Sequence, residues 1–288
     1  MAPKLHRRAP GVSLRSHDVK TKPGGGDAGK TIAELLVAKL ASMDLARAKT
    51  NVKQLQRLRV GTLCSGSDLV LHSFNRAAKQ LGECDIVPLF GCEQKAAKAN
   101  VIQRMSHQDL GFPDTCVFKD VLDMHGGING DAACHTHPQN PRCQIPMGSD
   151  GPVIVSAGWS CKNLSKRWSP TTEAAKQKKD WLQTKTGTTG ETFQGFMQYI
   201  QAAEPPIIHF ENVPELLTDT NWQYVKKEFE SRGYAADAIL CRADAFGYPT
   251  FRERAHGLAL HMDLCSLDAT GAAKLFTDIF KTMNKMKI

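Results

Sequence analysis

The stretch that most constrains the fold runs from Val153 to Cys161 and reads Val-Ile-Val-Ser-Ala-Gly-Trp-Ser-Cys. Its consecutive β-branched apolar residues predict a strand buried on both faces, as in a parallel sheet. The small residues that follow end this strand and leave the thiol of Cys161 on a loop at its carboxyl end. Open α/β sheets bind their ligands at that edge. The alternative for Cys161 is a buried cysteine that packs as a small hydrophobe.

Short apolar runs and helical patterns alternate along the chain, which predicts an α/β fold. The apolar runs predict further strands at 58–63, 86–91, 116–121, 207–210, 235–241 and 255–261. The helical patterns fall at 69–81, 94–105, 192–203 and 222–232.

Composition argues against a membrane or secreted protein and favours one that binds a polyanion. The chain has 288 residues, 41% of them hydrophobic, and no run reaches the ~18 apolar residues of a membrane span, so no membrane partner is expected. The N-terminal sequence lacks the apolar core of a secretory signal, which predicts an intracellular protein. Nine cysteines without a regular frame fit free thiols in a reducing compartment. The net charge of +8 favours a polyanionic partner such as nucleic acid.

Three predicted strands end in polar residues that suit a nucleotide-like ligand. The first strand leads into Cys64, Ser65, Gly66, Ser67 and Asp68, a small-residue turn that lets a ligand approach the backbone. Asp68 would repel a pyrophosphate, so a ligand without phosphates is expected. Glu93 after the second strand stands where such sheets hydrogen-bond a ribose, although it also suits a helix N-terminus. Asp120 and Val121 end the third strand.

A Gly-, His- and Pro-rich insertion at 124–151 separates the third strand from the fourth. Cys134, His135, His137 and Cys143 lie in it, but their spacing matches no standard zinc pattern. We therefore predict a polar surface loop without a metal, and leave zinc open as the alternative.

Two polar clusters near the C-terminal strands are candidates for catalysis. Glu211 and Asn212 stand at the end of the strand at 207–210, where they can supply a general acid and an orienting amide. Arg252 and Arg254 alternate, so on an extended segment both side chains point to one face. Two guanidinium groups there can hold an anion or a ring carbonyl.

The segment at 162–190 is predicted to be a mobile basic loop. Its cations are interleaved with tryptophans, a mixture that suits phosphates and unstacked bases. A solvated charged face is the alternative. The nucleic-acid-binding candidates are Lys162, Lys166, Arg167, Lys178 and Lys179.

Three regions are expected. Residues 1–29 are basic, rich in Pro and Gly and poor in large apolar residues, which predicts a disordered tail. That tail is a nuclear address, a nonspecific phosphate-binding arm or a plain solvated leader. Residues 30–57 carry the apolar spacing of a helical segment, and 58–288 form the catalytic domain.

The succession of these motifs resembles the cytosine-C5 DNA methyltransferases. Its most specific parts are Glu-Asn-Val at 211–213, Arg-x-Arg at 252–254 and the Gly-aromatic-x-Cys loop at 158–161, and it covers roughly 58–261. The resemblance implies a Rossmann-like S-adenosylmethionine-dependent methyltransferase sheet, mostly parallel, with helices on both faces. Ser160, Lys162, Asp68 and Thr250 depart from the family's usual residues.

The resemblance also implies site roles. Cys161 would add to carbon 6 of cytosine and activate carbon 5 toward the methyl group of S-adenosyl-L-methionine. Glu211 would bind ring nitrogen 3, Asn212 would fix the loop, and Arg252 and Arg254 would hold the ring carbonyl. The cofactor would contact the Cys64–Asp68 turn, Glu93 at the ribose, and Asp120 with Val121 at the adenine. The target base would leave the stack under the basic loop.

Two alternatives stay open. The segment at 264–288 shows neither a target-recognition region nor a final Gly-Asn motif, which leaves open a protein partner that supplies target recognition. A catalytically weak nucleic-acid-binding module is the first alternative. Methylation of a tRNA cytosine is the second, because a preformed RNA loop needs a smaller recognition region.

Overall fold

The computed structural model describes residues 57–66, 68–81, 85–125, 130–140, 142–165, 180–285 and 287. The predictions of a disordered tail at 1–29 and of a helical segment at 30–57 lie outside these residues, apart from Arg57. Arg57 belongs to the first strand, which therefore starts one residue before the predicted boundary.

The strands and helices largely match the apolar patterns of the sequence. The strands are β1 (Arg57–Leu63), β2 (Asp85–Cys92), β3 (Cys116–Phe118), β4 (Asp131–Ala133), β5 (Arg142–Gln144), β6 (Ile154–Ala157), β7 (Ile207–Asn212), β8 (Tyr234–Arg242) and β9 (Glu253–His261). The α-helices are α3 (Leu69–Leu81), α4 (Ala96–Val101), α6 (Gly187–Ala203), α7 (Asp219–Glu230) and α8 (Ala269–Lys285). A π-helix, η1 (Ile102–Gln108), continues α4, and short 3-10 turns are η2 (Val121–Asp123), η3 (Gly148–Asp150), η4 (Pro214–Leu217) and η5 (Asp244–Phe246).

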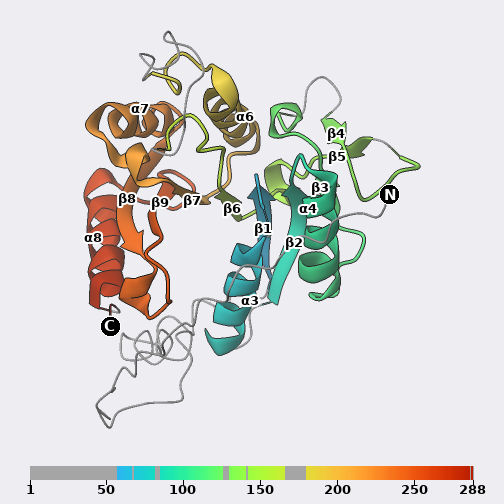
Figure 1. Ribbon diagram of the computed structural model, residues 1–288, viewed down its shortest axis with the longest axis horizontal. Coiled ribbons are helices and arrows are strands. Elements are labelled where there is room, and N and C mark those ends of the chain that lie inside the picture. The colour runs from blue at the N-terminus through green and yellow to red at the C-terminus, as the bar shows by residue number, and fades with distance from the viewer. Residues whose placement is uncertain are drawn as a thin grey trace, which may run out of the picture.

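Seven strands form one mostly parallel sheet in the order β3-β2-β1-β6-β7-β9-β8 (Figure 1). Strands β3, β2, β1, β6 and β7 pair in parallel, whereas β9 is antiparallel to both of its neighbours. The parallel part has the strand order of a Rossmann sheet, with β9 inserted before the last strand. The predicted α/β fold class is confirmed.

Helices cover both faces of this sheet. On one face α6 and α7 bury Phe193, Phe196 and Phe229 against the strands. On the other face Leu71 of α3 packs beside Val60, and Phe276 of α8 packs beside Leu260. Because successive strand residues point to opposite faces, the near-continuous apolar strands supply both cores.

An irregularity in β2 sets the position of the residues that follow it. Val60 pairs with Pro88 but Gly61 pairs with Phe90, so Leu89 is an extra residue in the ladder. Proline has no N–H to donate, which makes a bulge at this point inexpensive. Beyond the bulge the ring of Phe90 lies over Gly61, where a larger side chain would clash with it. The apolar pattern of the sequence gives no sign of this shift.

The antiparallel direction of β9 brings its first residues to the carboxyl edge of the parallel strands. Glu211 pairs with His256 and Asn212 with Ala255, so Arg254 lies just past the end of β7. The loop after β6, which carries Cys161, leaves the sheet at the same edge. Residues from distant parts of the sequence therefore meet along the carboxyl edge of the parallel strands, which we call the rim.

Two predicted boundaries are corrected. The predicted basic loop at 162–190 overlaps α6, which begins at Gly187 and is five residues longer at its start than the predicted helix. The insertion at 124–151 is not a plain surface loop, because it contains the β4–β5 hairpin and buries Ala132, Cys134 and Ile145. Apolar side chains spaced along the insertion explain why it folds back onto the domain.

Within the described part of the chain, no helix combines the length and the apolar character that crossing a membrane demands.

Candidate active site

The loop that carries Cys161 is held against the start of α6 by hydrogen bonds. Thr192 Oγ1 accepts a bond from the Ser160 amide at 3.1 Å, and Thr189 Oγ1 accepts one from the Asn163 amide at 2.9 Å. Asn163 Oδ1 in turn accepts a bond from the Thr189 amide at 3.1 Å. The Cys161 carbonyl accepts bonds from the next turn, so the backbone on both sides of the thiol is fixed.

Trp159 anchors the same loop in the core. Its side chain is 2% exposed and stacks on Phe196 with ring centroids 5.3 Å apart. The Trp159 carbonyl accepts a 3.1 Å bond from Nδ2 of Asn212, whose Oδ1 accepts from the Val213 amide. Asn212 therefore ties the end of β7 to the loop. Cys161 itself is half-buried.

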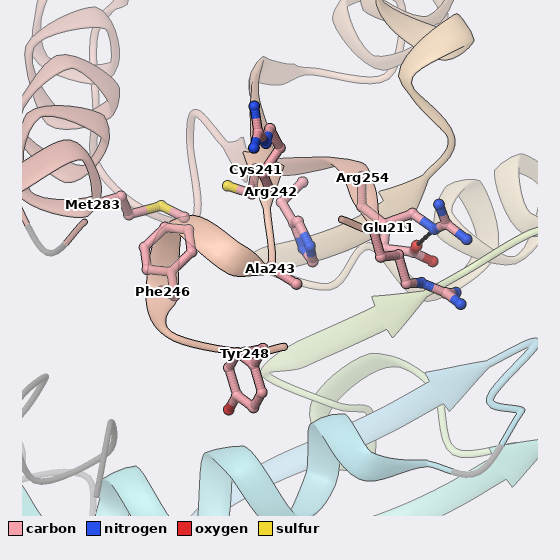
Figure 2. Close-up of a pocket in the computed structure, with 10 residues that line it drawn as sticks. Glu211, Cys241, Arg242, Ala243, Phe246, Tyr248, Arg254 and Met283 are labelled. Atoms are coloured by element: carbon pink, nitrogen blue, oxygen red, sulfur yellow. Dashed lines mark ion pairs between the residues drawn. The ribbon is translucent and has the colours of Figure 1, made fainter. Parts of the chain in front are cut away.

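Glu211 and Arg254 form an ion pair at the end of β7. Glu211 Oε1 lies 2.6 Å from Arg254 Nε, and both side chains are partly exposed (Figure 2). A Cβ atom placed on Gly158 would lie 3.6 Å from Glu211 Oε2, so the carboxylate lies beside the loop that leads to Cys161. Three segments thus place an acid, a guanidinium group and the thiol loop together.

Two cavities meet at the arginines, because Arg252 and Arg254 line both. The first measures about 570 Å³ and contains the predicted nucleophile. It is lined by Cys161, Ser165, Val213, Thr250, Phe251, Arg252, Glu253 and Arg254. The second measures about 510 Å³ (Figure 2) and is lined by Glu211, Cys241, Arg242, Ala243, Phe246, Tyr248, Arg252, Arg254, His256 and Met283. Each cavity is large enough for a flat heterocyclic ring.

The positive charge at these cavities comes from arginine, not from histidine. His256 lines the second cavity and stacks on His209, which also bonds the Ser156 hydroxyl at 2.9 Å. Burial lowers the pKa of His209 to about 4, and burial also lowers the pKa of His256. Both imidazoles are therefore neutral near pH 7, whereas guanidinium groups stay charged.

The small-residue turn after β1 and the end of β2 are joined through Glu93. Glu93 Oε2 accepts a 3.1 Å bond from the Gly66 amide, and Oε1 accepts a 3.0 Å bond from the Lys95 amide at the start of α4. Glu93 thus does bind the N-terminus of a helix, which was the alternative predicted for it. Each carboxylate oxygen has a second lone pair, so a ribose hydroxyl can still bind. A Cβ atom on Gly66 would have no neighbour within 4 Å, so the turn leaves open space for a ligand.

Negative charge gathers at this turn. Burial, followed by the charges of Glu93 and Asp120, raises the pKa of the Cys64 thiol to about 12. The thiol is therefore neutral near pH 7, and the two carboxylates lie close to it. Asp120 caps η2 by accepting a 3.0 Å bond from the Leu122 amide. Such a site suits a cationic ligand and disfavours a phosphate.

Asp68, which replaces a family glycine, has a strongly perturbed carboxyl group. Its side chain is 1% exposed and its φ is 56°, in the left-handed region. Burial raises the pKa of this carboxyl to about 7, although the Thr62 hydroxyl lowers it in part. The folded state therefore favours the protonated acid. This contribution to stability is complete below the ordinary value of 3.8 and is lost as the pH rises through 7.

We expect Asp68→Asn to stabilise the protein, and to do so by about 2–3 kcal/mol more at pH 8 than at pH 5, because the amide does not ionise. Asparagine also tolerates the left-handed backbone. Urea unfolding at the two pH values measures the difference. The exposed carboxylate of Asp123 supplies the control Asp123→Asn, which should leave the pH dependence as in the wild type. Equal effects of Asp68→Asn at both pH values would contradict the prediction.

The structure brings together most, not all, of the predicted site residues. Cys161, Arg252 and Arg254 share one cavity, and Glu211 joins the arginines in the other. Cys64, Ser65, Gly66, Asp68, Glu93, Asp120 and Val121 cluster at the ends of β1, β2 and β3, where Val121 is 3% exposed within η2 rather than in a strand. Lys162 is exposed beside Cys161. Lys166, Arg167, Lys178 and Lys179 lie outside the described residues.

Sequence reasoning missed three features of this region. Thr189 and Thr192 were placed in a loop or helix without their bonds to the Cys161 segment, although a threonine cluster at a helix start is a capping signal. Met283 of the unpredicted helix α8 lines the second cavity. Cys116 of β3 lies beside the cysteines of the insertion. Apart from the threonine cluster, no local sequence pattern predicts these contacts, because the residues that form them are far apart in the sequence.

The fold and the rim define the class of protein. The fold is a Rossmann-like α/β sheet that carries an acidic turn after β1 and a loop cysteine after β6 at the carboxyl edge of its parallel strands. The model of the family "C-5 cytosine-specific DNA methylase" matches residues 171–286. This match includes Glu211 and both arginines. Over these residues the chain is similar to the C-5 cytosine-specific DNA methylase family.

Two curated relatives are named as methyltransferases. The chain is 28% identical over 212 residues to the DNA (cytosine-5-)-methyltransferase DMT5 of Cryptococcus neoformans, covering 71% of this chain and 8% of that protein. It is 27% identical over 129 residues to the type II methyltransferase M.NgoFVII of Neisseria gonorrhoeae, covering 44% of this chain and 29% of that protein. The chain thus spans only a small part of the length of these relatives.

Among solved structures, the S. pombe Dnmt2 methyltransferase superposes with a TM-score of 0.45 at 15% identity, over 71% of this chain and 51% of that chain. A Spodoptera frugiperda DNMT2 mutant gives a TM-score of 0.45 at 11% identity, over 71% of this chain and 50% of that chain. Both likenesses are low, so the fold assignment depends on the strand order and pairing described above.

Proposed function

We propose that this chain transfers a methyl group from S-adenosyl-L-methionine to carbon 5 of cytosine in DNA through a covalent adduct with Cys161. One observation carries the proposal. The half-buried thiol of Cys161 opens into a cavity with Arg252 and Arg254, and Arg254 holds the carboxylate of Glu211 at 2.6 Å. A nucleophile, an acid and a pair of forked cations are the groups that this reaction requires.

The chain's own residues divide the chemistry among them. The Cys161 thiolate forms a bond to carbon 6, and the ring electrons move to carbon 5. Glu211 hydrogen-bonds ring nitrogen 3, and the guanidinium groups bind the ring carbonyl, so both stabilise the charge that builds up on the ring. After methyl transfer a base removes the proton from carbon 5, and the electron pair re-forms the ring double bond as the thiolate leaves.

S-adenosyl-L-methionine is the methyl donor in this proposal, and it supplies an electrophilic methyl group on a positively charged sulfur. The open space at Gly66 and the carboxylates of Glu93 and Asp120 fit such a cation. In the proposal Cys64, Ser65, Gly66 and Asp68 form the turn beside the ligand. Glu93 accepts from the ribose hydroxyls, and Asp120 with Val121 flanks the adenine.

DNA is the proposed substrate, and the target cytosine must leave the base stack to reach the Cys161 cavity. Phe251 is 83% exposed at the mouth of that cavity and offers a ring on which a base can stack. Exposed Lys162 lies beside the thiol, where it can contact a phosphate. A genomic substrate makes the nucleus the proposed site of action in a eukaryotic cell, and a protein partner is proposed to supply target recognition.

The test is covalent capture. Duplex DNA containing 5-fluorocytosine should trap wild-type protein in the presence of S-adenosyl-L-methionine, because fluorine at carbon 5 cannot be removed as a proton. The complex should survive denaturing electrophoresis. Cys161→Ser should form none, whereas Cys265→Ser, a change at another half-buried free cysteine, should form as much as the wild type.

The other outcomes separate the competing functions. Absence of a wild-type adduct, together with salt-dependent DNA binding that Cys161→Ala leaves unchanged, would replace catalysis with a nucleic-acid-binding module. An adduct that forms with a tRNA containing 5-fluorocytosine and not with duplex DNA would make RNA the substrate.

A further inference from the structure

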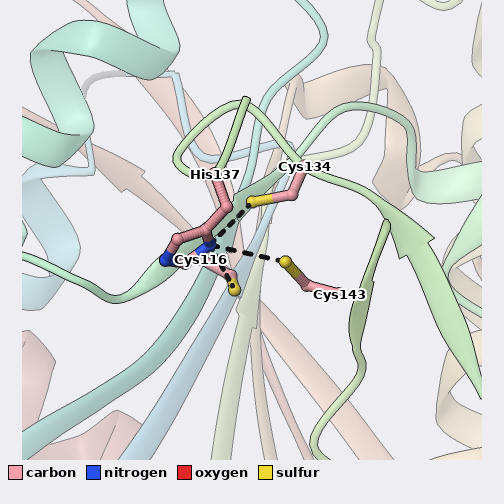
Figure 3. A group of neighbouring side chains, drawn as sticks. All are labelled: Cys116, Cys134, His137 and Cys143. Carbon is pink, nitrogen blue, oxygen red and sulfur yellow. Dashed lines mark hydrogen bonds between the residues drawn. The ribbon is translucent and has the colours of Figure 1, made fainter. Parts of the chain in front are cut away.

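We propose that Cys116, Cys134, His137 and Cys143 bind one structural zinc ion. Cys116 begins β3, Cys134 and His137 belong to the insertion after β4, and Cys143 lies on β5 (Figure 3). The four ligand atoms all lie within 4.8 Å of one another. Figure 3 shows the three sulfur atoms arranged around the near nitrogen of the imidazole ring.

The distances fit a tetrahedral ion. Nδ1 of His137 lies 3.6 Å from Cys116 Sγ, 3.7 Å from Cys134 Sγ and 3.4 Å from Cys143 Sγ. A zinc ion with Zn–S of ~2.3 Å, Zn–N of ~2.0 Å and tetrahedral angles separates sulfur from nitrogen by about 3.5–3.6 Å. The three observed nitrogen–sulfur separations scatter around this value, and no two of the four ligand atoms are more than 4.8 Å apart, so their spacing suits one central ion.

Hydrogen bonding does not account for this cluster. Nδ1 of an imidazole carries either one hydrogen or one lone pair, both in the ring plane. It can therefore satisfy one thiol. Cys134 Sγ also accepts a 3.3 Å bond from the Thr136 amide and Cys143 Sγ lies 3.9 Å from the Asn140 carbonyl, but neither bond explains why three sulfur atoms gather at one nitrogen. A cation in the centre satisfies all four ligands at once. Three thiolates and an imidazole are a donor set that selects zinc among the common metal ions.

His135 is not part of this site. Its Nε2 lies 3.2 Å from the Glu93 carbonyl, at the end of β2. The metal candidates named from the sequence are thus changed in one member, since Cys116 takes the place of His135. The prediction of an insertion without metal is replaced by this proposal. Cys116 precedes Cys134 by a long segment, so spacing alone could not reveal it.

The proposed ion would join the insertion to the sheet. Phe118 and Cys134 form an isolated antiparallel bridge, and the Val117 amide donates a 2.9 Å bond to the Thr136 hydroxyl. These contacts cover the outer edge of β3, which otherwise ends the sheet. Four protein ligands leave no open position, so the ion would be structural rather than catalytic.

The site also lies behind the proposed cofactor pocket. The chain between Cys134 and His137 supports Glu93 through His135, and the Lys119 amide just before Asp120 bonds the Ala133 carbonyl. Loss of the ion should therefore loosen the ends of β2 and β3. This consequence follows from the contacts alone and does not depend on which methyl acceptor the protein uses.

Metal content tests the proposal without methyl donor or DNA. The full chain, purified under reducing conditions from cells grown with zinc and then desalted, should contain about one zinc per chain by plasma mass spectrometry. His137→Ala and Cys143→Ser should each lose it. The matched variants His135→Ala and Cys265→Ser should keep it, because His135 is a neighbouring histidine and Cys265 is a distant half-buried thiol.

A measurement on wild-type protein covers the case in which a ligand variant fails to fold. Exchange of zinc for cobalt(II) should give the intense visible bands of a tetrahedral ion and the thiolate charge-transfer bands of a sulfur-rich site. Wild-type protein that holds no zinc overturns the proposal. So does zinc that His137→Ala retains and His135→Ala loses, or a disulfide between two of the three thiols in the reduced, zinc-supplied protein.

Discussion

Glu211→Gln should lower the rate of methyl transfer by about 10²–10³-fold, the usual effect of removing one group that stabilises charge in a transition state. Glutamine keeps the size of the side chain, but it loses the acid that ring nitrogen 3 needs and leaves Arg254 without its 2.6 Å partner. Single-turnover methylation of duplex DNA measures the rate of the chemical step. The dissociation constant for DNA should change far less than this rate, because in the proposal Glu211 contacts only the target base.

The matched control for Glu211→Gln is Glu228→Gln. Glu228 forms a 3.0 Å ion pair with Arg232 within α7, and its exposure is similar to that of Glu211, but it is remote from both cavities. This variant removes a carboxylate from an arginine without touching the proposed site, so its methylation rate should equal that of the wild type. A Glu211→Gln rate within about threefold of the wild type would exclude the proposed role of the acid.

Trp159→Ala should lower the free energy of unfolding by about 3–5 kcal/mol, the range for truncating a fully buried aromatic side chain. The indole contacts Phe193, Phe196 and Phe210 with ring centroids 5.1, 5.3 and 5.7 Å away. Urea unfolding followed by circular dichroism measures the change without relying on tryptophan fluorescence. Methyl transfer should also fall under conditions where the variant is folded, because Trp159 anchors the loop that carries Cys161.

Two variants calibrate this result. Trp159→Phe keeps an aromatic ring and removes the buried indole N–H, which has no hydrogen-bond partner among the described residues, so it should cost about 1–2 kcal/mol. Trp222→Ala truncates a partly buried tryptophan at the edge of the same core, so it should cost less than Trp159→Ala. Equal losses in Trp159→Ala and Trp222→Ala would show that Trp159 is not the anchor described here.

Much of the secondary structure could be predicted because the apolar patterns are local. Helix α3 has the predicted bounds, and strands β1, β2, β7, β8 and β9 overlap the predicted runs. Helix α6 was predicted too short because its first turn holds Gly187 and Gly190, which local propensity assigns to a loop. The backbone of the 181–185 turn packs so closely on Gly190 that a larger side chain would clash with it. Glycine is therefore required at position 190 by this close tertiary contact and not by a need for a flexible backbone.

Part of the candidate site could likewise be predicted from local patterns, and part could not. Cys161, Glu211 and Asn212 could be named because each follows an apolar run, and the ends of parallel strands share an edge. The zinc ligands could not be assembled in the same manner. Cys116 and the insertion meet through side-chain contacts across the edge of β3, and no periodic pattern in the sequence encodes which histidine turns toward the cysteines.

The sequence by itself determined the class of sheet and the chemical groups that stand at the ends of its strands, because strand-forming runs and the residues that end them are properties of short segments. Only the tertiary structure decided how those groups combine. The antiparallel entry of β9 pairs Arg254 with Glu211, the bulge in β2 positions the strand that ends at Glu93, and Asn212 binds the Trp159 carbonyl. These arrangements arise from packing and hydrogen bonding between segments far apart in the chain, where local preference has no influence.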